Sequence, residues 1–403
     1  MTAKRTGTPL SKKALSALVG DLRQVASVRR FLLSDGSEAG IETLAFSTGG
    51  GLDFWVTAGR GMDIATLSWR GIQLAWQSPA GFRLPPATAG TGDRTFNRAF
   101  GGFLNTCGFE HIRQPAEGNP LHGSAPFTPA RLNSYGEDWN TAEPLLYCEG
   151  ELVVWAFGGG GHRLHRRIEA PIGGSTLRIV DAVEVIGPDP APIMALYHFN
   201  LGYPLHQEGT EISLDGVVVT GPLPRHEPAP AQSTLHTASP GRAVCRVDGG
   251  GATIAFHWST DTLPWLQLWR DLRPGCGVLS VEPCSIARSE DGRSTSTPCI
   301  EPGRPVRFEI EVILADAVHA RTPVTFNDRE NCSRSLRGLR MWPRVAIATR
   351  ATLRLAATIV GRVKVWRASS HGSIWNGGSR NGSSRRTPRP SKSLVLRVTR
   401  TRP

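Results

Sequence analysis

One carboxylate next to a proline is the first candidate for chemistry in this sequence. The segment Gly277–Cys284 reads Gly-Val-Leu-Ser-Val-Glu-Pro-Cys, and its valines and leucine favour a pleated strand. Pro283 has no N–H to donate to a ladder, so we expect the strand to end at or beside Glu282. The carboxylate would then lie at the rim of a sheet, where it can act as a general base facing His122 and His198. The alternative is a solvated glutamate, because charged side chains are mostly exposed.

The two histidines occur in different sequence contexts. His122 follows an Asn-Pro-Leu segment and precedes a glycine, and such a loop offers little core packing, which favours a role in a site. His198 lies in the run Tyr197–Gly202, where a hydrogen-bonded core histidine is as reasonable as a functional one. Imidazole titrates near neutral pH, so either side chain suits proton transfer beside a carboxylate.

Four further polar residues are candidates for substrate contacts. Arg60 and Asp63 lie in a segment flanked by glycines, where Arg60 could hold a pair of hydroxyls or an anionic group. The alternative is an internal ion pair between these two residues that shapes a turn. Gln267 and Arg270 flank Trp269 on an expected strand and could contact a sugar, although a polar strand face explains them equally well. We assign Trp269 itself to the core, because buried aromatic rings contribute strongly to packing.

The composition bounds the class of protein. The chain has 403 residues, 39% of them hydrophobic, and its 45 glycines and 30 prolines indicate many turns. The basic N-terminus is not followed by an apolar core, so we expect no signal peptide. No window of about 18 uninterrupted apolar residues occurs, so we expect no membrane span. The seven cysteines are scattered, which suits a reducing compartment, and we therefore predict a cytoplasmic location.

The basic charge is confined to one end of the chain. The formal net charge is +12, but residues 331–403 contain 17 Lys and Arg and no acidic residue. Residues 1–330 therefore hold 29 basic and 34 acidic residues, a net charge of −5. A basic arm that touches nucleic acid or anionic surfaces is one interpretation of the tail. We favour the other, a tail without selected structure, such as an out-of-frame extension, and we expect it to be disordered and nucleic-acid binding to be absent.

Hydrophobic patterning predicts an all-β protein. Short runs of alternating or apolar residues recur from Val28 onward, and Pro305–Leu314 alternates strictly, as expected for an antiparallel strand with one wet face. Ser11 precedes apolar residues at helical spacing and could cap a short N-terminal helix. We expect a large antiparallel β-sandwich over residues 26–325. A leader and helix precede it at residues 1–25, and the basic tail follows at residues 326–403.

At three points, in order and at compatible spacing, the chain resembles the aldose 1-epimerases of the galactose mutarotase-like superfamily. The three segments are Asn119–Gly123, Tyr197–Gly202 and Leu279–Glu282. They resemble the family's Asn-x-Leu-His-Gly segment, its His-x-Tyr-Phe-Asn-Leu segment and the strand that bears its catalytic glutamate. The segments Gly59–Ile64 and Thr106–Gly108 are similar to those of a bacterial branch whose biochemistry is poorly defined. The resemblance implies the large β-sandwich of this superfamily.

The resemblance also implies an acid–base mechanism that opens and recloses a cyclic aldose. In the family a glutamate removes the proton of the anomeric hydroxyl and a histidine protonates the ring oxygen, each contributing typically ~10²–10⁴ in rate. Carried over, Glu282 is the base, and His198 and His122 complete the catalytic set. The family's acid aligns with Leu196, and a shift of two residues along a strand keeps His198 on the same face. The implied substrate contacts, with no cofactor and no metal, are Arg60, Asp63, Asn119, Asn200, Gln267 and Arg270.

Two other functions remain open at this stage. One is a metal-dependent sugar isomerase, in which His122, His198, His206 and Glu282 would hold the metal. The sequence has no closely spaced histidine pair to begin such a site, so we rank it lower. The other is a non-catalytic carbohydrate-binding module, because the same sandwich can hold a sugar without converting it. In each case the expected partner is a small-molecule sugar.

Overall fold

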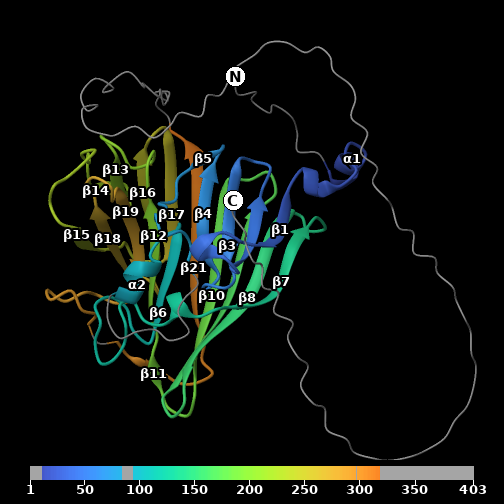
Figure 1. Ribbon diagram of the computed structural model, residues 1–403. Coiled ribbons are helices and arrows are strands. Elements are labelled where there is room, and N and C mark those ends of the chain that lie inside the picture. The colour runs from blue at the N-terminus through green and yellow to red at the C-terminus, as the bar shows by residue number, and fades with distance from the viewer. Residues whose placement is uncertain (1–10, 84–93, 296, 318–403) are drawn as a thin grey trace, which may run out of the picture. The chain divides into compact units, whose positions relative to one another are not determined.

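Antiparallel sheets make up most of the protein in a computed structural model, which describes residues 11–83, 94–295 and 297–317. The strands of the largest sheet follow one another across the molecule (Figure 1). In spatial order this nine-stranded sheet contains β14 (Val217–Thr220), β13 (Glu211–Leu214), β16 (Arg242–Gly249), β17 (Ala252–Ser259), β21 (Val306–Asp316), β10 (Thr176–Ile186), β9 (Gly160–Pro171), β8 (Leu145–Ala156) and β7 (Arg131–Asp138).

Two five-stranded sheets and a short ribbon complete the β-structure. The first sheet is a meander of β1 (Ser27–Leu32), β2 (Glu42–Ser47), β3 (Leu52–Thr57), β4 (Asp63–Trp69) and β5 (Ile72–Gln73). The second has the spatial order β15 (Gln232–Thr237), β18 (Trp265–Asp271), β19 (Val278–Cys284), β12 (Met194–Leu201) and β6 (Leu104–Phe109). The ribbon pairs β11 (Ala191–Pro192) with β20 (Cys299–Ile300). The predicted all-β antiparallel sandwich is therefore confirmed.

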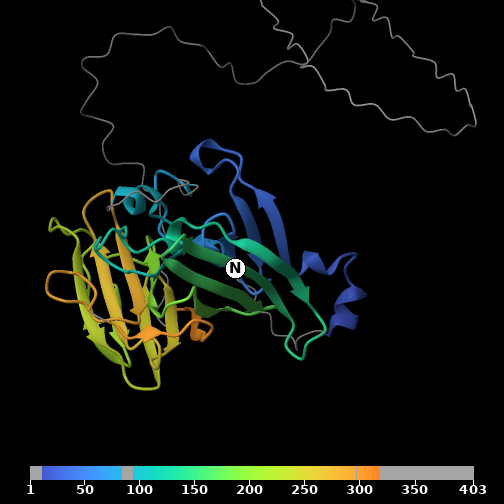
Figure 2. The ribbon, with the colours of Figure 1, turned by 90° about the horizontal axis from the view of Figure 1, so that it is seen from below.

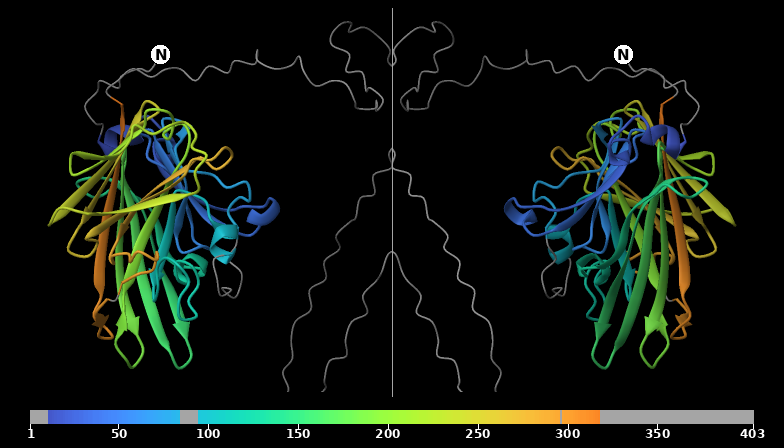
Figure 3. Two further views of the ribbon diagram at one scale, coloured as in Figure 1. Left: turned by 90° about the vertical axis from the view of Figure 1, so that its left-hand side faces the viewer. Right: turned by 90° about the vertical axis from the view of Figure 1, so that its right-hand side faces the viewer.

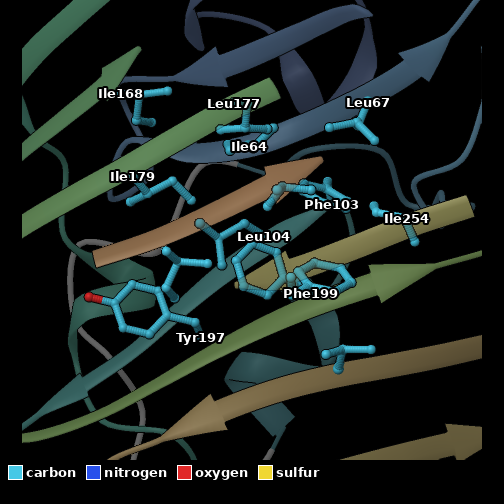
Figure 4. Packing of buried hydrophobic residues seen from close by; sticks show 14 of the residues in the cluster. Ile64, Leu67, Phe103, Leu104, Ile168, Leu177, Ile179, Tyr197, Phe199 and Ile254 are labelled. Carbon is cyan, nitrogen blue, oxygen red and sulfur yellow. The ribbon is translucent and has the colours of Figure 1, made fainter. Parts of the chain in front are cut away.

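The three sheets share one hydrophobic core. Alternate residues of β10 and β21 are buried while the residues between them are more exposed, as the strict alternation of the sequence predicts. Figure 4 shows side chains from β4, β9, β10, β12 and β17 meeting between the sheets. The long strands β8, β9 and β10 (green) run side by side (Figures 2 and 3). Their buried residues belong to the same core cluster as those of the second five-stranded sheet.

Helices are few and short in the described residues. They are α1 (Lys12–Ser16), α2 (Arg94–Ala99) and the 3₁₀ turns η1 (Leu22–Gln24), η2 (Gly36–Glu38) and η3 (Ala125–Phe127). Ser11 caps α1 as predicted, because its hydroxyl accepts a hydrogen bond from the N–H of Ala14 (3.2 Å). The helix is shorter than the apolar spacing suggests. Asp21 caps a separate turn, η1, by accepting from the N–H of Arg23 (2.8 Å).

The sequence prediction for the end of β19 is wrong by two residues. The strand continues through Pro283 to Cys284, and Glu282 lies inside the sheet with no exposed surface rather than at a rim. Towards β12 the register pairs Leu196 with Cys284 and Phe199 with Val281, and the ladder is interrupted between them. That gap faces the proline, which has no N–H to donate. A central strand therefore tolerates Pro283 because only a local break in pairing results.

Two further sequence predictions concern membrane spans and the two ends of the chain. No helix among the described residues is long and apolar enough to cross a membrane. The basic tail predicted at residues 326–403 lies outside the described residues, as do residues 1–10 of the leader and helix segment predicted at residues 1–25.

Candidate functional site

Register places Glu282 opposite His198 on neighbouring strands. The pairs that flank the gap between β12 and β19 set the same alignment on both sides, so Glu282 and His198 face each other across it. Gln267 on β18 is the register partner of Glu282 on the other side. Paired residues point to the same face of an antiparallel sheet, so the three side chains converge on one face. The carboxylate is thus flanked by an imidazole and an amide.

The two oxygens of Glu282 have different surroundings. The amide of Gln267 donates from Nε2 to Oε2 at 2.6 Å, whereas Oε1 lies 3.4 Å from Nε2 of His198 and has no hydrogen-bond partner in the described structure. Burial raises the pKa of Glu282, and the nearby His198 and the hydrogen bond from Gln267 act in the opposite direction. One oxygen is therefore held in place, and the other is available to accept a proton.

A buried amide network fixes the imidazole of His198. Asn200 donates from Nδ2 to the carbonyl of Gly102 (3.0 Å) and to Asn105 Oδ1 (3.1 Å). Its Oδ1 therefore faces Nδ1 of His198, 2.7 Å away, and also accepts from Ser280 Oγ (2.8 Å). By this assignment Nδ1 donates its proton, which leaves Nε2 to share a proton with Glu282.

This network changes the role expected for Asn200. Both ends of its amide are engaged in the protein, and the residue has no exposed surface. It therefore lies behind the imidazole and orients His198 instead of facing a ligand.

His122 approaches the same place from the loop between β6 and η3. Its backbone has φ +64°, and its ring centroid lies 5.6 Å from that of His198 in an edge-on arrangement. Burial lowers the pKa of His122 well below its usual value, and the neighbouring His198 adds to the effect. The ring is therefore neutral at physiological pH, and it can donate one hydrogen bond and accept another. The structure thus brings together the three residues that the sequence predicted to be catalytic.

Aromatic rings cover the two histidines. Phe96 of α2 packs on His122 (centroids 4.6 Å) and on His198 (6.1 Å). Phe100 lies 5.3 Å from the His198 ring and 5.9 Å from Trp269. The sequence analysis assigned Trp269 to the core, but its ring also lies 5.9 Å from His198. Flat apolar surfaces beside polar groups are typical of sites that hold a small ligand.

Arg113 is a member of the site that the sequence analysis missed. Its Nε donates to Oε1 of Gln267 at 3.0 Å, on the far side of that amide from Glu282. Its backbone N–H approaches Nδ1 of His122 at 3.4 Å, and its carbonyl accepts from the N–H of His122 at 2.9 Å. The residue is 3% exposed. A buried arginine is rare without a specific set of partners, but only the structure shows those partners.

Arg60 and Asp63 belong to a different cluster. Register pairs Tyr197 with Thr106 and His198 with Asn105, so Tyr197 and Thr106 point to the opposite face from His198. Asp63 lies beside Arg166, which also donates to Thr106 Oγ1 (2.8 Å), so Asp63 belongs to the cluster on that opposite face. The contact of Asp63 with Arg166 is 3.6 Å, and the ion pair between Arg60 and Asp63 that was the alternative is not formed in the described residues. The structure does not bring these two predicted contacts to Glu282.

Two other predicted contacts make no hydrogen bond or ion pair with Glu282, His198 or His122 in the described residues. Asn119 closes a turn by donating its backbone N–H to the carbonyl of Ala116 (2.8 Å). Arg270 lies three residues after Gln267 on β18, so its side chain points to the opposite face of the sheet. It bonds to Gln232 (2.5 Å) and Glu227 (3.4 Å). Of the six predicted substrate contacts, the described structure therefore joins Gln267 directly to Glu282 and Asn200 to His198.

The ligand set proposed for a metal is not assembled in the described part of the chain. No group of three or more His, Cys, Asp or Glu side chains is arranged there to hold a metal ion. His206 is buried, and its backbone N–H donates to the carbonyl of Gly202 (3.0 Å). Burial lowers the pKa of His206, with a further contribution from His226. The metal-dependent alternative therefore has no support from the described residues.

Comparison with known proteins places the chain in a family without an assigned function. A family model described as "Domain of unknown function (DUF4432)" matches residues 38–314. No curated protein matches the sequence.

Solved structures identify the fold. A protein from Klebsiella pneumoniae, provisionally described as an aldose 1-epimerase, superposes with a TM-score of 0.63 at 18% identity, covering 71% of this chain and 83% of its own. A galactose mutarotase-like protein from Clostridium acetobutylicum has a TM-score of 0.51 at 10% identity, covering 72% and 98%. A Synechocystis protein has a TM-score of 0.51 at 14% identity, covering 68% and 95%. The predicted galactose mutarotase-like fold is confirmed.

Proposed function

Because this chain belongs to the DUF4432 family and has the galactose mutarotase-like fold, we propose that it interconverts the anomers of an aldose or aldose derivative. The observation that supports this most directly is the contact between Oε1 of Glu282 and Nε2 of His198 at 3.4 Å. It joins a carboxylate oxygen without a hydrogen-bond partner to an imidazole nitrogen across two strands. A proton acceptor and a proton donor are thereby adjacent on one sheet face.

Anomer exchange needs such a pair, because the two oxygens concerned are bonded to the same carbon. Glu282 as carboxylate removes the proton of the anomeric hydroxyl, and the C1–O1 bond becomes a carbonyl while the bond from C1 to the ring oxygen breaks. His198 as imidazolium gives its Nε2 proton to the ring oxygen. The C1–C2 bond then rotates, and the reverse transfers close the ring on the other face with no net gain or loss of protons.

His122 has a separate role in this mechanism. Burial keeps its ring neutral, so it is a poor source of a full proton but a good hydrogen-bond donor to a sugar oxygen. We assign it the placement of the sugar beside the Glu282–His198 pair. Gln267 holds Oε2 of Glu282, so the carboxylate presents Oε1 to the substrate.

The sugar reaches these groups from the side that the aromatic rings cover. Glu282 has no exposed surface, and His198 and His122 are 4% and 8% exposed. Phe96 and Phe100 lie on the two imidazoles, so these rings must shift when a sugar enters. The aromatic rings also exclude water, which strengthens the electrostatic interaction between Glu282 and His198.

The test is anomer exchange, followed by polarimetry or by magnetisation-transfer NMR across a panel of neutral aldoses and sugar acids. We expect the wild-type protein to accelerate exchange of at least one sugar. Glu282→Gln should lower that rate by about 10²–10⁴ while sugar binding, measured by calorimetry, is retained. Glu309→Gln on β21 is the matched control, because it changes a partly exposed glutamate of the other sheet.

Two outcomes would contradict the proposal. Binding of a sugar without acceleration for any member of the panel would favour the carbohydrate-binding module. Equal exchange rates in the wild-type protein and Glu282→Gln would remove Glu282 from the mechanism.

A further inference from the structure

The site contains one buried arginine that the acid–base mechanism does not use. Every N–H of the Arg113 guanidinium points to a partner in the protein. Nε donates to Gln267. The terminal nitrogens donate to the carbonyls of Ile286 (2.7 Å) and Ala287 (3.0 Å), to Ser294 Oγ (3.3 Å) and to Cys284 Sγ (3.2 Å).

The bond from Arg113 decides which way the amide of Gln267 faces. A guanidinium has only donors, so the amide atom beside Nε must be the oxygen. The amide nitrogen then points to Oε2 of Glu282, 2.6 Å away, and donates to it. A flipped amide would set its oxygen against the carboxylate, which would disfavour the ionised form. Arg113 therefore selects the arrangement in which Glu282 is a carboxylate.

The backbone of the same residue is bonded to His122. Arg113 and His122 both adopt left-handed backbone conformations, with φ +72° and +64°. Side chains other than glycine rarely occupy this region, and such residues cluster at functional sites. Two hydrogen bonds join them, from Arg113 N–H to the Nδ1 of His122 and from His122 N–H to the carbonyl of Arg113. An Nδ1 that accepts a hydrogen bond carries no proton, so the single ring proton of neutral His122 lies on Nε2.

We propose that Arg113 is the positioning residue of the site, in which its guanidinium orients Gln267 against Glu282 and its backbone N–H sets the tautomer of His122. This inference rests on the proposed function. It goes beyond it because one residue outside the reacting set fixes both the base and the imidazole that places the sugar. If Arg113 only anchored its loop to residues 284–294, its replacement would lower stability and leave kcat unchanged.

The first test separates positioning from loop clamping by kinetics. Arg113→Lys keeps the charge but loses the planar fork, so we expect kcat for the fastest-exchanged aldose to fall by about tenfold, the equivalent of one hydrogen bond. Gln267→Met should produce a similar loss. Because both act through one amide, the double variant should be no slower than Gln267→Met alone. Losses that multiply in the double variant would overturn the proposal.

The second test follows the titration of Glu282 by NMR of carboxyl-labelled glutamate. The charged and titratable groups that face it are His198 from β12, Arg113 from the loop after β6, Arg288 beyond β19, and the thiols of Cys107 and Cys284. Arg113→Lys should move the pKa of Glu282 upward in the wild-type background and leave it unchanged in Gln267→Met. Equal upward shifts in both backgrounds would show an effect of charge and overturn the role of the amide.

Arg288→Gln is the matched charge control. Arg288 lowers the pKa of Glu282 through its charge, but its hydrogen bond goes to the carbonyl of Ser233 (3.2 Å). Its effect should therefore be the same in the wild-type and Gln267→Met backgrounds. If the change in the pKa of Glu282 caused by Arg288→Gln also depended on Gln267, the titration could not distinguish orientation of the amide from charge. The role assigned to Arg113 would then be overturned.

Two readouts need no arginine variant and remain decisive if Arg113→Lys does not fold. Imidazole ¹⁵N shifts of His122 in the wild-type protein should report a proton on Nε2, and a proton on Nδ1 would overturn the backbone part of the proposal. The Nε–H of Arg113 should exchange slowly with water in the wild-type protein and faster in Gln267→Met. Unchanged exchange would overturn the guanidinium part. A wild-type protein that exchanges no anomers would contradict the proposed function, while these two NMR results would still decide the positioning role.

Discussion

The carboxyl of Glu282 is held in surroundings that oppose its ionisation. Burial raises its pKa, and a carboxyl whose pKa is higher in the folded chain binds its proton more tightly there. Ionising it therefore costs stability at pH values above the folded pKa, by about 1.4 kcal/mol for each unit of displacement. This cost disappears below the unfolded value of about 4.3. The carboxylate that we propose as the base is thus a group that lowers the stability of the fold at neutral pH.

A stability measurement can test whether the ionised carboxylate of Glu282 destabilises the folded protein. We predict that Glu282→Gln raises the free energy of unfolding at pH 8, because Gln267 and His198 can bond to an amide without burying a charge. The gain should shrink as the pH falls and vanish near pH 4. Urea unfolding at several pH values measures it. Activity should be lost in the same variant.

The control for this prediction is Glu309, whose pKa is shifted in the opposite direction. Partial burial acts to raise the pKa of Glu309, but hydrogen bonds and the charge of Arg178 lower it overall. Glu309→Gln should therefore give no gain at pH 8. A wild-type protein more stable at pH 8 than Glu282→Gln would show that the carboxylate and His198 stabilise each other more than burial penalises them.

At the scale of elements, helix α2 shields the imidazoles of His122 and His198 from solvent. Phe96 is 4% exposed and packs on both rings. We predict that Phe96→Ala admits water to His122, so that its lowered pKa returns towards the usual value of about 6.5. The Cε1–H resonance of His122 should then titrate at higher pH than in the wild-type protein. KM for the sugar should rise, because an apolar wall of the site is lost.

A phenylalanine at the tip of another element provides the control. Phe157 lies in the connection between β8 and β9 and is 95% exposed. Phe157→Ala should change neither the titration of His122 nor the KM. If Phe96→Ala leaves the titration of His122 unchanged, the low pKa has a cause other than this ring.

Elements also explain what the sequence could and could not predict. Alternation along β10 and β21 is visible in the sequence because each of these strands has one face in the core. The end of β19 was misjudged because Pro283 causes only a local gap of two pairs in the ladder with β12, and this gap depends on the neighbouring strand. Local patterns identified Glu282 and His198, but the orientation of Gln267 depends on Arg113, 154 residues away.

The same limit applies to the segment before β6. Residues 94–99 form α2, a short helix that the sequence analysis did not identify. Helices this short have little stability of their own and depend on packing, here of Phe96 against the imidazoles. Arg60 and Asp63 were placed near the site from their glycine-rich context, but Asp63 contacts Arg166, which bonds to the Thr106 side chain on the opposite face of β6. Sequence context alone does not fix the face of a distant sheet.

At the scale of the whole sandwich, a buried polar network joins the two layers. Arg166 on β9 makes a two-pronged bond to Asp181 on β10, at 2.9 and 2.6 Å, with both side chains at most 1% exposed. It also donates to Thr106 Oγ1 on β6 (2.8 Å), and the hydroxyl of Tyr197 on β12 donates to Asp181 (2.6 Å). Figure 4 shows Tyr197 among the apolar side chains of the core. The network therefore links the nine-stranded sheet to the sheet that bears the candidate site.

We predict that Asp181→Asn destabilises the protein by about 3–5 kcal/mol, because it leaves the charge of Arg166 buried without its main partner. Urea unfolding measures the loss. Asp248→Asn is the control, because Asp248 forms the same kind of pair with Arg246 at the surface and should cost at most about 1 kcal/mol. Since the network lies on the face opposite His198, kcat per folded molecule should be unchanged in Asp181→Asn. A fall in kcat without a loss of stability would instead connect this network to the chemistry on the other face.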